Sequence, residues 1–383
     1  MFNFKQYNFR KLNISLIVLV VVITAIGAYM IKLSQGGDPK LFTKQIFGIV
    51  LGVIAMAFVA IVDYHFLAKL AAPLWVLGVF LLLLVKVPGI GVELYEARRW
   101  IDLKIVQIQP SELCKMCLIV VLAAYFYKFT EKINKPLIIA GSALLTAVPL
   151  LFILDQPDLS SSMVIIFVYL ILLYSAGISY KIVLPVLIVT VPTAIALIWY
   201  VLQPYQNLLH PYQQERILGL IYPDKYPDLM MQQNLSVNEI SSGKLYGILM
   251  GDKSLDSLKS PYLPVSECDF IFTVVGETLG FLGTSVVIII LGIIILKCFF
   301  IARKAKDRLG YLICIGVGSM YMFQVFVNIG VATRILPNTG LPLPFLSYGL
   351  SSLVSYMIGI GLVLNVGLQG RNLGSRIMWK DVL

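Results

Sequence analysis

The sequence predicts an all-α polytopic membrane protein, and three observations support that prediction. Of the 383 residues, 59% are hydrophobic and only 13% are charged, whereas soluble globular proteins are roughly half apolar and a quarter charged. Apolar stretches long enough to cross about 30 Å of hydrocarbon as helices recur along the whole chain. Basic residues gather in alternate connections between these stretches. We therefore expect about ten transmembrane helices in a single domain over residues 1–383.

Ten apolar segments define the expected helices. The first is not expected to be a signal peptide, because Lys5, Arg10 and Lys11 precede a full-length apolar run and no small-residue cleavage pattern follows it. The third and fourth segments are short for a membrane span. The ten segments are residues 13–34, 43–62, 72–87, 110–127, 137–154, 159–177, 181–202, 270–296, 310–332 and 345–368.

The basic residues orient these helices. Sixteen of the 30 lysines and arginines fall in the two tails and in the loops of one side, against four acidic residues. The positive-inside rule then places both termini in the cytoplasm, and the net charge of +10 needs no nucleic acid to explain it. One long extracytoplasmic loop, residues 203–265, follows between helices 7 and 8. Its apolar content predicts a surface helix or a cover over a cavity.

Asp269 stands where this long loop runs into an apolar helix. A carboxylate at the mouth of a membrane helix is costly to keep, so it marks a candidate functional site. The structural alternative is a capping box, with Ser266 as N-cap and Asp269 at the third helical position. Glu277 lies eight positions later, about 80° away around an ideal helix, and would add a second acid to the same sector.

Two further expected helix starts carry acids on the same outer side. Pro110 opens the fourth helix and is followed by Glu112 and Lys115, whose spacing of three allows an ion pair along the helix. Asp158 precedes the sixth helix in the same manner. Capping and internal pairing are the structural alternatives for both starts. A functional role is favoured because Lys115 inside the membrane has to be neutralised or face water.

Positive charge accompanies these acids. Arg98, Arg99, Lys104 and Arg216 are outer-side cations in this topology, and three helix N-termini add positive ends. Such an assembly suits a phosphate or pyrophosphate group, with ordinary anionic lipid as the alternative ligand.

Residues 336–349 add three prolines and two glycines at the bilayer edge. Irregular backbone at that depth is tolerated where it lines a cavity.

The motifs, in this order, resemble those of the SEDS family (shape, elongation, division and sporulation), which includes RodA, FtsW and SpoVE. The resemblance covers nearly the whole chain. Its marks are Arg99-Trp100-Ile101, Gln109-Pro110-Ser111-Glu112 with Lys115, Gln156-Pro157-Asp158-Leu159, Tyr212-Gln213 with Arg216, Asp269-Phe270-Ile271-Phe272 with Glu277-x-Leu279-Gly280, and Pro337 to Gly349.

The resemblance implies a peptidoglycan glycosyltransferase in the cytoplasmic membrane of a bacterium. Such a protein polymerises lipid II, an undecaprenyl-pyrophosphate-linked disaccharide peptide, on the outer face, beside a class B penicillin-binding protein. The essential aspartate of the family falls on Asp269. Its conserved pair falls on Glu112 and Lys115, its loop arginine on Arg99, and its acid before the sixth helix on Asp158.

That reaction gives each candidate residue an expected role. Asp269 is the predicted general base for the 4-hydroxyl of the acceptor, in an inverting displacement. Arg99, Lys115 and Arg216 are expected to stabilise the departing pyrophosphate. Glu112 would hold Lys115. The predicted substrate-binding set is completed by Asp158, by Glu277, which would orient the base helix, and by Ser347 of the last motif.

Neither a cofactor nor a disulfide is assigned from the sequence. The five cysteines lie in or next to helices without a loop framework, so no disulfide scaffold or zinc site is predicted. No ligand cluster identifies a metal, and a divalent cation that shares the pyrophosphate role is the alternative.

The chain also departs from the family pattern. Family members commonly have glycine near Glu96, Lys104, Arg334 and Leu350, glutamate at Val265 and threonine at Cys268. A bulkier cavity wall would alter acceptor or partner preference or lower activity.

Two other functions use the same features. A lipid II transporter would need the cavity and cations but no base, and a scaffold for a penicillin-binding protein would need no chemistry. Elongation, division and sporulation roles are not separated by the sequence.

Overall fold

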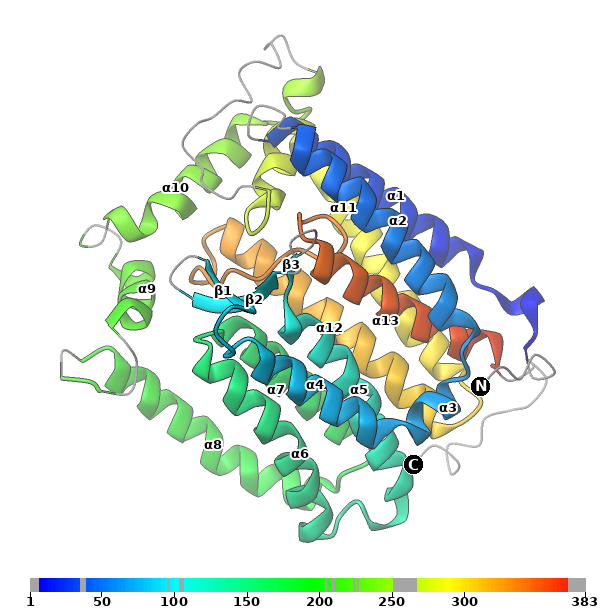
Figure 1. Cartoon of the computed structure of the whole chain (residues 1–383). Coiled ribbons are helices and arrows are strands. Elements are labelled where there is room, and N and C mark those ends of the chain that lie inside the picture. The colour runs from blue at the N-terminus through cyan, green and yellow to red at the C-terminus, as the bar shows by residue number, and fades with distance from the viewer. Residues whose placement is uncertain are drawn as a thin grey trace.

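The computed structural model describes residues 7–34, 39–94, 97–102, 107–203, 205–207, 211–222, 225, 227–250 and 267–370. Helices dominate these residues, with one small sheet (Figure 1). The α-helices are α1 (Ile14–Leu33), α2 (Pro39–Ile61), α3 (Tyr64–Lys69), α4 (Ala71–Leu84), α5 (Pro110–Lys128), α6 (Pro136–Asp155), α7 (Leu159–Ser175), α8 (Tyr180–Val201), α9 (Pro211–Ile221), α10 (Pro227–Ser242), α11 (Ile271–Arg303), α12 (Arg308–Ala332) and α13 (Leu350–Leu368). Short 3-10 helices in the described part of the chain include η2 (Phe9–Lys11), η4 (Thr130–Lys132) and η6 (Ile248–Met250), and the strands described are β1 (Gly91–Leu94), β2 (Ala97–Asp102) and β3 (Gln107–Ile108).

Each of the ten predicted apolar segments is a helix, which confirms the all-α polytopic class. Among the described residues, eight helices are long and apolar enough to cross a membrane, and α4 and α7 are shorter apolar helices. Two boundaries differ from the prediction by five residues or more. Helix α11 continues to Arg303, and α13 begins at Leu350 rather than at residue 345. Residues 345–349 instead belong to the irregular segment that precedes α13.

The centre of the bundle is formed by α5, α12 and α13, whose apolar windows are mostly buried. Small residues let neighbouring backbones approach closely, as is usual between membrane helices. Gly27 of α1 is one such position, because a Cβ there would lie 2.7 Å from the Cα of Leu346. Helix α8 lies at the edge of the bundle with most of its described side chains exposed (Figure 1), as expected for a helix that faces lipid.

A three-stranded antiparallel sheet occupies part of the loop between α4 and α5. Strand β2 is central: Trp100 pairs with Val92 of β1, and Ile101 pairs with Ile108 of β3. These strands were not predicted from the sequence. The sheet matters for the site because it carries Arg99, which lies at the irregularity between the Val92–Trp100 and Glu93–Arg98 pairs.

The two ends of the bundle gather the segments that the positive-inside rule assigned to opposite sides. At one end, the amide of Asn8 donates to the carbonyl of Leu368 at 3.0 Å, so the N-terminal tail lies against the end of α13 (Figure 1). At the same end, His65 lies between Asp63 and Asp307 at 2.9 and 2.6 Å. The starts of α5, α7 and α11 meet the segment before α13 at the opposite end.

Part of the long predicted loop folds back onto the bundle. Helices α9 and α10 lie at the end of the bundle that carries the sheet, at the left in Figure 1, and the Gln233 amide of α10 donates to the carbonyls of Val331 and Leu336 at 2.9 and 2.8 Å. The Ser236 hydroxyl donates to the carbonyl of Ala332 at 2.8 Å. Helix α10 is thus bound to the end of α12 rather than lying free at the surface.

Helix α11 is interrupted at Gly280, whose backbone has φ 65° and ψ −170°. Positive φ is accessible to glycine at little cost. The segment after α10 fills the interruption, since the amides of Phe281 and Leu282 donate to the carbonyls of Lys244 and Leu245 at 2.8 and 3.2 Å. These bonds replace the ones that the helix loses at the kink, as unpaired backbone groups in a membrane protein require.

Candidate active site

Asp269 lies in a turn directly before α11 and is partly exposed. Helix α11 begins at Ile271, with Phe270 as its N-cap residue and no side-chain capping bond. The capping-box alternative is therefore wrong in placing Asp269 at the third helical position, and Ser266 lies outside the described residues. The 80° relation to Glu277 is also wrong, because Asp269 is not part of the helix that carries Glu277.

The backbone around Asp269 is hydrogen-bonded at three successive carbonyls. The carbonyl of Glu267 accepts from the amide of Tyr348 at 2.8 Å. The carbonyl of Cys268 accepts from the Ser347 hydroxyl at 2.6 Å, and that of Asp269 accepts from the side-chain amide of Asn328 at 2.8 Å. These bonds bind the start of α11 to α12 and to the irregular segment before α13.

Gly340 approaches the carboxylate of Asp269. It is exposed, its φ is +73°, and a Cβ at this position would lie 3.3 Å from Oδ2 of Asp269. The neighbouring carbonyl of Thr339 accepts a hydrogen bond from the Ser160 hydroxyl in the first turn of α7. The 339–340 turn therefore joins the start of α7 to the predicted base.

Asp158 is the N-cap of α7 and accepts a hydrogen bond from the amide of Ser161 at 3.0 Å. It is buried, and this bond satisfies one of the free amides at the helix start. The capping alternative for Asp158 is confirmed locally. The preceding turn is held by Arg99, whose Nε and Nη2 donate to the carbonyls of Gln156 and Pro157 at 2.9 and 2.6 Å. Arg99 thus joins the sheet to the start of α7.

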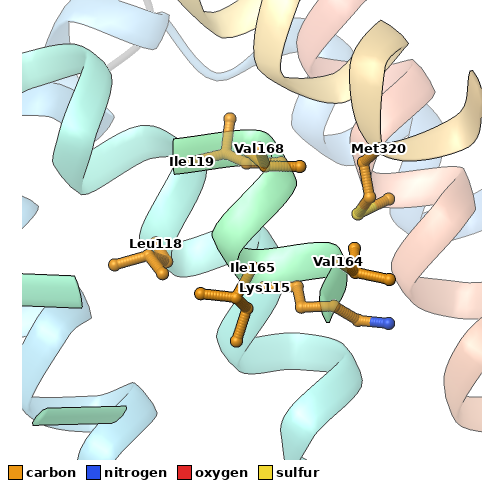
Figure 2. Close-up of a pocket in the computed structure, with 7 residues that line it drawn as sticks. All are labelled: Lys115, Leu118, Ile119, Val164, Ile165, Val168 and Met320. Atoms are coloured by element: carbon orange, nitrogen blue, oxygen red, sulfur yellow. The ribbon is translucent and has the colours of Figure 1, made fainter. Parts of the chain in front are cut away.

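Glu112 and Lys115 form the predicted ion pair, with 2.7 Å between Oε1 and Nζ. Their side chains are only 2% and 1% exposed, and Pro110 occupies the first turn of α5, as predicted. Lys115 lines a small pocket between α5, α7 and α12 with Val164, Ile165 and Met320, and Figure 2 shows its amine on the side of the pocket where Val164 and Met320 lie. Among the described residues, Oε2 of Glu112 has no hydrogen-bond partner.

The remaining predicted residues are distributed unevenly. Glu277 is buried in α11. Ser347 is also buried, and its hydroxyl lies between the carbonyl of Cys268 and the amide of Leu343. Arg216 belongs to α9, but its side chain lies outside the described residues, as do Glu96, Lys104 and Val265. Arg334 has φ +61°, a conformation that favours the glycine common in the family at this position.

Four residues near Asp269 received no role from the sequence. Gly340 stood inside the recognised motif from Pro337 to Gly349, whereas Asn328 lay outside the recognised motifs. Ser160 and Glu267 carried no signal beyond their closeness to Asp158 and Asp269. Glu267 is buried two residues before Asp269, and burial raises the pKa of its carboxyl group.

The described residues contain no group of three or more His, Cys, Asp or Glu side chains that could hold a metal ion. Glu112 lies on α5, Asp158 directly before α7 and Asp269 directly before α11, and Glu112 and Asp158 are bound to protein groups. No ligand set for a divalent cation is therefore assigned from these residues.

Together the fold and the site define a multi-pass membrane protein with a carboxylate site where several helix starts meet at one end of the bundle. The chain belongs to the FtsW/RodA/SpoVE family, described as cell cycle proteins, because residues 7–372 match the model of that family. The resemblance inferred from the motifs is thereby confirmed.

Several curated relatives are similar over almost their whole length. Stage V sporulation protein E of Bacillus subtilis is 30% identical, covering 94% of this chain and 98% of the relative. Peptidoglycan glycosyltransferase MrdB of Escherichia coli K12 is 30% identical, covering 93% of both chains. Probable peptidoglycan glycosyltransferase FtsW of Trichlorobacter lovleyi is 29% identical, covering 94% of both.

Solved structures agree with this assignment. A chain from a peptidoglycan synthase complex that coordinates polymerization and crosslinking superposes with a TM-score of 0.76 at 31% identity, covering 94% of this chain and 97% of that chain. The rod shape determining protein RodA of Thermus thermophilus superposes with a TM-score of 0.67 at 28% identity, covering 94% and 96%.

Proposed function

We propose that this chain is a peptidoglycan glycosyltransferase that polymerises lipid II into glycan strands on the outer face of a bacterial cytoplasmic membrane. Relatives similar over nearly their full length carry this activity in their names, which supports the reaction class. The observation that carries the mechanism is the placement of Asp269. The residue is partly exposed at the end of the bundle where the starts of α5, α7 and α11 meet, while its backbone carbonyl is bound by Asn328.

In the proposed mechanism, Asp269 accepts the proton of the acceptor's 4-hydroxyl. The oxygen of that hydroxyl attacks the anomeric carbon of the donor sugar while the bond to the pyrophosphate breaks, so the configuration inverts. A base within hydrogen-bond reach of the attacking hydroxyl lowers the barrier for such a step. The exposure of Asp269 is consistent with this role, because the lipid-linked sugar reaches the site from the water side of the membrane.

The departing pyrophosphate needs positive charge. Two nitrogens of Arg99 bind carbonyls before α7, and we assign its third, Nη1, to the phosphate. Arg216 remains a proposed phosphate ligand on α9. Lys115 is enclosed and neutralised by Glu112, so direct contact with a phosphate would require this pair to open. We therefore infer that Glu112 and Lys115 mainly fix the start of α5.

A class B penicillin-binding protein is the proposed partner. The support is the similarity to a chain from a peptidoglycan synthase complex in which polymerization and crosslinking are coordinated. A glycan polymerase placed beside a transpeptidase hands over its strand before that strand diffuses away. The partner would be bound within the membrane and on its outer face.

The test uses purified protein in liposomes with lipid II, with and without a penicillin-binding protein. The Asp269→Asn variant keeps the shape of the side chain and removes the base. We expect loss of glycan chains with lipid II binding retained. Full polymerisation by this variant would refute the proposed base. A wild type that translocates lipid II without polymerising it, together with an Asp269→Asn variant that has lost translocation, would favour a transporter. Complementation of a deletion strain by the Asp269→Asn variant would favour a scaffold.

A further inference from the structure

Two buried side chains bridge the segment that carries Asp269 and the irregular segment before α13. Asn328 of α12 is 1% exposed, and its Nδ2 donates both to the carbonyl of Asp269 at 2.8 Å and to the carbonyl of Leu341 at 2.7 Å. Ser347 is 4% exposed, and its hydroxyl donates to the carbonyl of Cys268 at 2.6 Å while accepting from the amide of Leu343 at 2.7 Å.

Each of these side chains uses its donor capacity on protein backbone. A side-chain amide has two N–H donors, and Asn328 places both on carbonyls. A serine hydroxyl has a single O–H, and Ser347 directs it at Cys268. Ser347 therefore has no hydrogen to offer a substrate in this arrangement, which separates it from the ligand-binding role that the sequence suggested.

We infer that Asn328 and Ser347 are positioning residues for Asp269, and this inference rests on the proposed function. The side chain of Asn328 binds the backbone carbonyl of Asp269, and the carbon of that carbonyl is bonded to the Cα that carries the carboxylate side chain. Asn328 also fixes Leu341, the neighbour of the Gly340 that faces Oδ2. The two residues thus set both the orientation of the base and the width of the gap in front of it.

The expected loss follows from geometry. A displacement of about 1 Å in a reacting group can lower the rate about 100-fold. Substrate affinity depends on the wider cavity and should change little. Loss of either side chain should therefore lower kcat and leave KM nearly unchanged, whereas a general loss of structure would also impair lipid II binding and stability.

The variants Asn328→Leu and Ser347→Ala test this inference, with Gln324→Met as the matched control. Gln324 lies one turn earlier on α12, is fully buried, and donates from Nε2 to the hydroxyl of Tyr356 at 3.2 Å. Its replacement removes a comparable buried amide without touching residues 267–269. Steady-state polymerisation of lipid II, lipid II binding and amide exchange of the 341–348 peptide are measured for all three variants.

We expect kcat to fall about 100-fold for both test variants, with KM and lipid II binding close to wild type. Amide exchange in 341–348 should accelerate for Ser347→Ala, because Leu343 loses its acceptor, and should be unchanged for Gln324→Met. Wild-type kcat in Ser347→Ala, or an equal fall in Gln324→Met, would overturn the inference. Ser347→Ala deletes one oxygen only and so decides the outcome even when Asn328→Leu does not fold.

Failure of the inference and failure of the proposed function give different results. An inactive Asp269→Asn beside a fully active Ser347→Ala refutes the positioning role alone. An Asp269→Asn variant with wild-type kcat refutes the base itself, whatever the two bridging side chains do.

Discussion

Gly340 faces the carboxylate of Asp269 so closely that even a methyl group at this position would be tightly packed against it. A Cβ at Gly340 would lie 3.3 Å from Oδ2, tighter than ordinary van der Waals contact, and the backbone there has φ +73°. The bare backbone of Gly340 thus keeps open the space that an acceptor hydroxyl would occupy in front of the base.

Gly340→Ala is expected to lower polymerase activity about tenfold or more, because the methyl group occupies that space and shifts the base. A left-handed backbone with a Cβ also costs about 1–2 kcal/mol of stability. Gly89→Ala separates the two effects, since Gly89 has φ +86° and an added Cβ there would have no atom within 4 Å. Both variants should lose similar stability, and only Gly340→Ala should lose activity. Equal activities in lipid II polymerisation would contradict the assigned role.

Removing either partner of the buried ion pair between Glu112 and Lys115 is expected to cause a large loss of stability. Breaking a buried pair leaves an uncompensated charge and costs about 3–5 kcal/mol. Glu112→Leu or Lys115→Met alone should therefore be strongly destabilised. The double apolar variant should recover most of the loss, because no isolated charge remains buried. Thermal unfolding in detergent measures all three.

The exposed pair of Lys86 and Asp155 is the control. Their side chains are 46% and 59% exposed, and such surface pairs contribute about 0–1 kcal/mol. Lys86→Met should change the unfolding temperature little.

A double variant at 112 and 115 that is no more stable than the single variants would contradict the expectation. It would show that the apolar replacement leaves a packing defect larger than the charge effect.

The cluster around His65 predicts how stability depends on pH. The hydrogen bond to Asp307 raises the pKa of His65 against the opposing effect of burial. Burial alone would raise the pKa of Asp63 and of Asp307, but hydrogen bonds from His65 and other neighbouring groups outweigh burial and lower both pKa values. Tyr64 also faces Asp307 at 3.0 Å, and burial raises its pKa, so it stays neutral over the tested range.

The sign of the effect follows from these directions. The raised pKa of His65 contributes stability that is fully present below its unfolded pKa of about 6.5 and is lost as pH rises through the folded pKa. The lowered pKa values of the two aspartates contribute stability that is present above about 3.9 and lost as pH falls through their folded values. We expect the melting temperature to decline as pH rises above about 6.5, and His65→Gln to flatten that decline. An unchanged slope in His65→Gln would exclude the cluster as its cause.

Local sequence signals predicted the helices and part of the site. Apolar runs fixed the spans, Pro110 marked the start of α5, and the spacing of Glu112 and Lys115 predicted their pairing. These features depend on residues within one turn of each other. Asp269 was recognised because a carboxylate beside a long apolar run is unusual.

The rest depends on contacts between distant parts of the chain. Asn328 reaches Asp269 across 59 positions, and no local pattern specifies which carbonyl a buried amide will find. The sheet arises from three short segments whose pairing depends on the closure of the loop between α4 and α5. The expected start of the last helix was early for the same reason, since the Ser347 hydroxyl and Tyr348 amide are bound to residues before α11 rather than to their own helix.

The interruption of α11 supplies the last prediction. A Cβ at Gly280 would overlap the backbone nitrogen of Gly247, where no real side chain fits, and φ there is +65°. Gly280→Ala should therefore push the segment after α10 away from the kink and free the amides of Phe281 and Leu282. Because α10 also binds the end of α12, we expect both lower thermal stability and lower polymerase activity.

Gly292→Ala is the control in the same helix. Gly292 has no atom within 4 Å of an added Cβ, and alanine favours an exposed helix interior over glycine by about 1 kcal/mol. This variant should be as stable as the wild type or slightly more so, with unchanged activity. Proteolysis of the 203–265 loop gives an independent measurement, because displacement of α10 exposes its backbone. Equal cleavage rates and activities in Gly280→Ala and Gly292→Ala would mean that the kink does not hold the loop against the bundle.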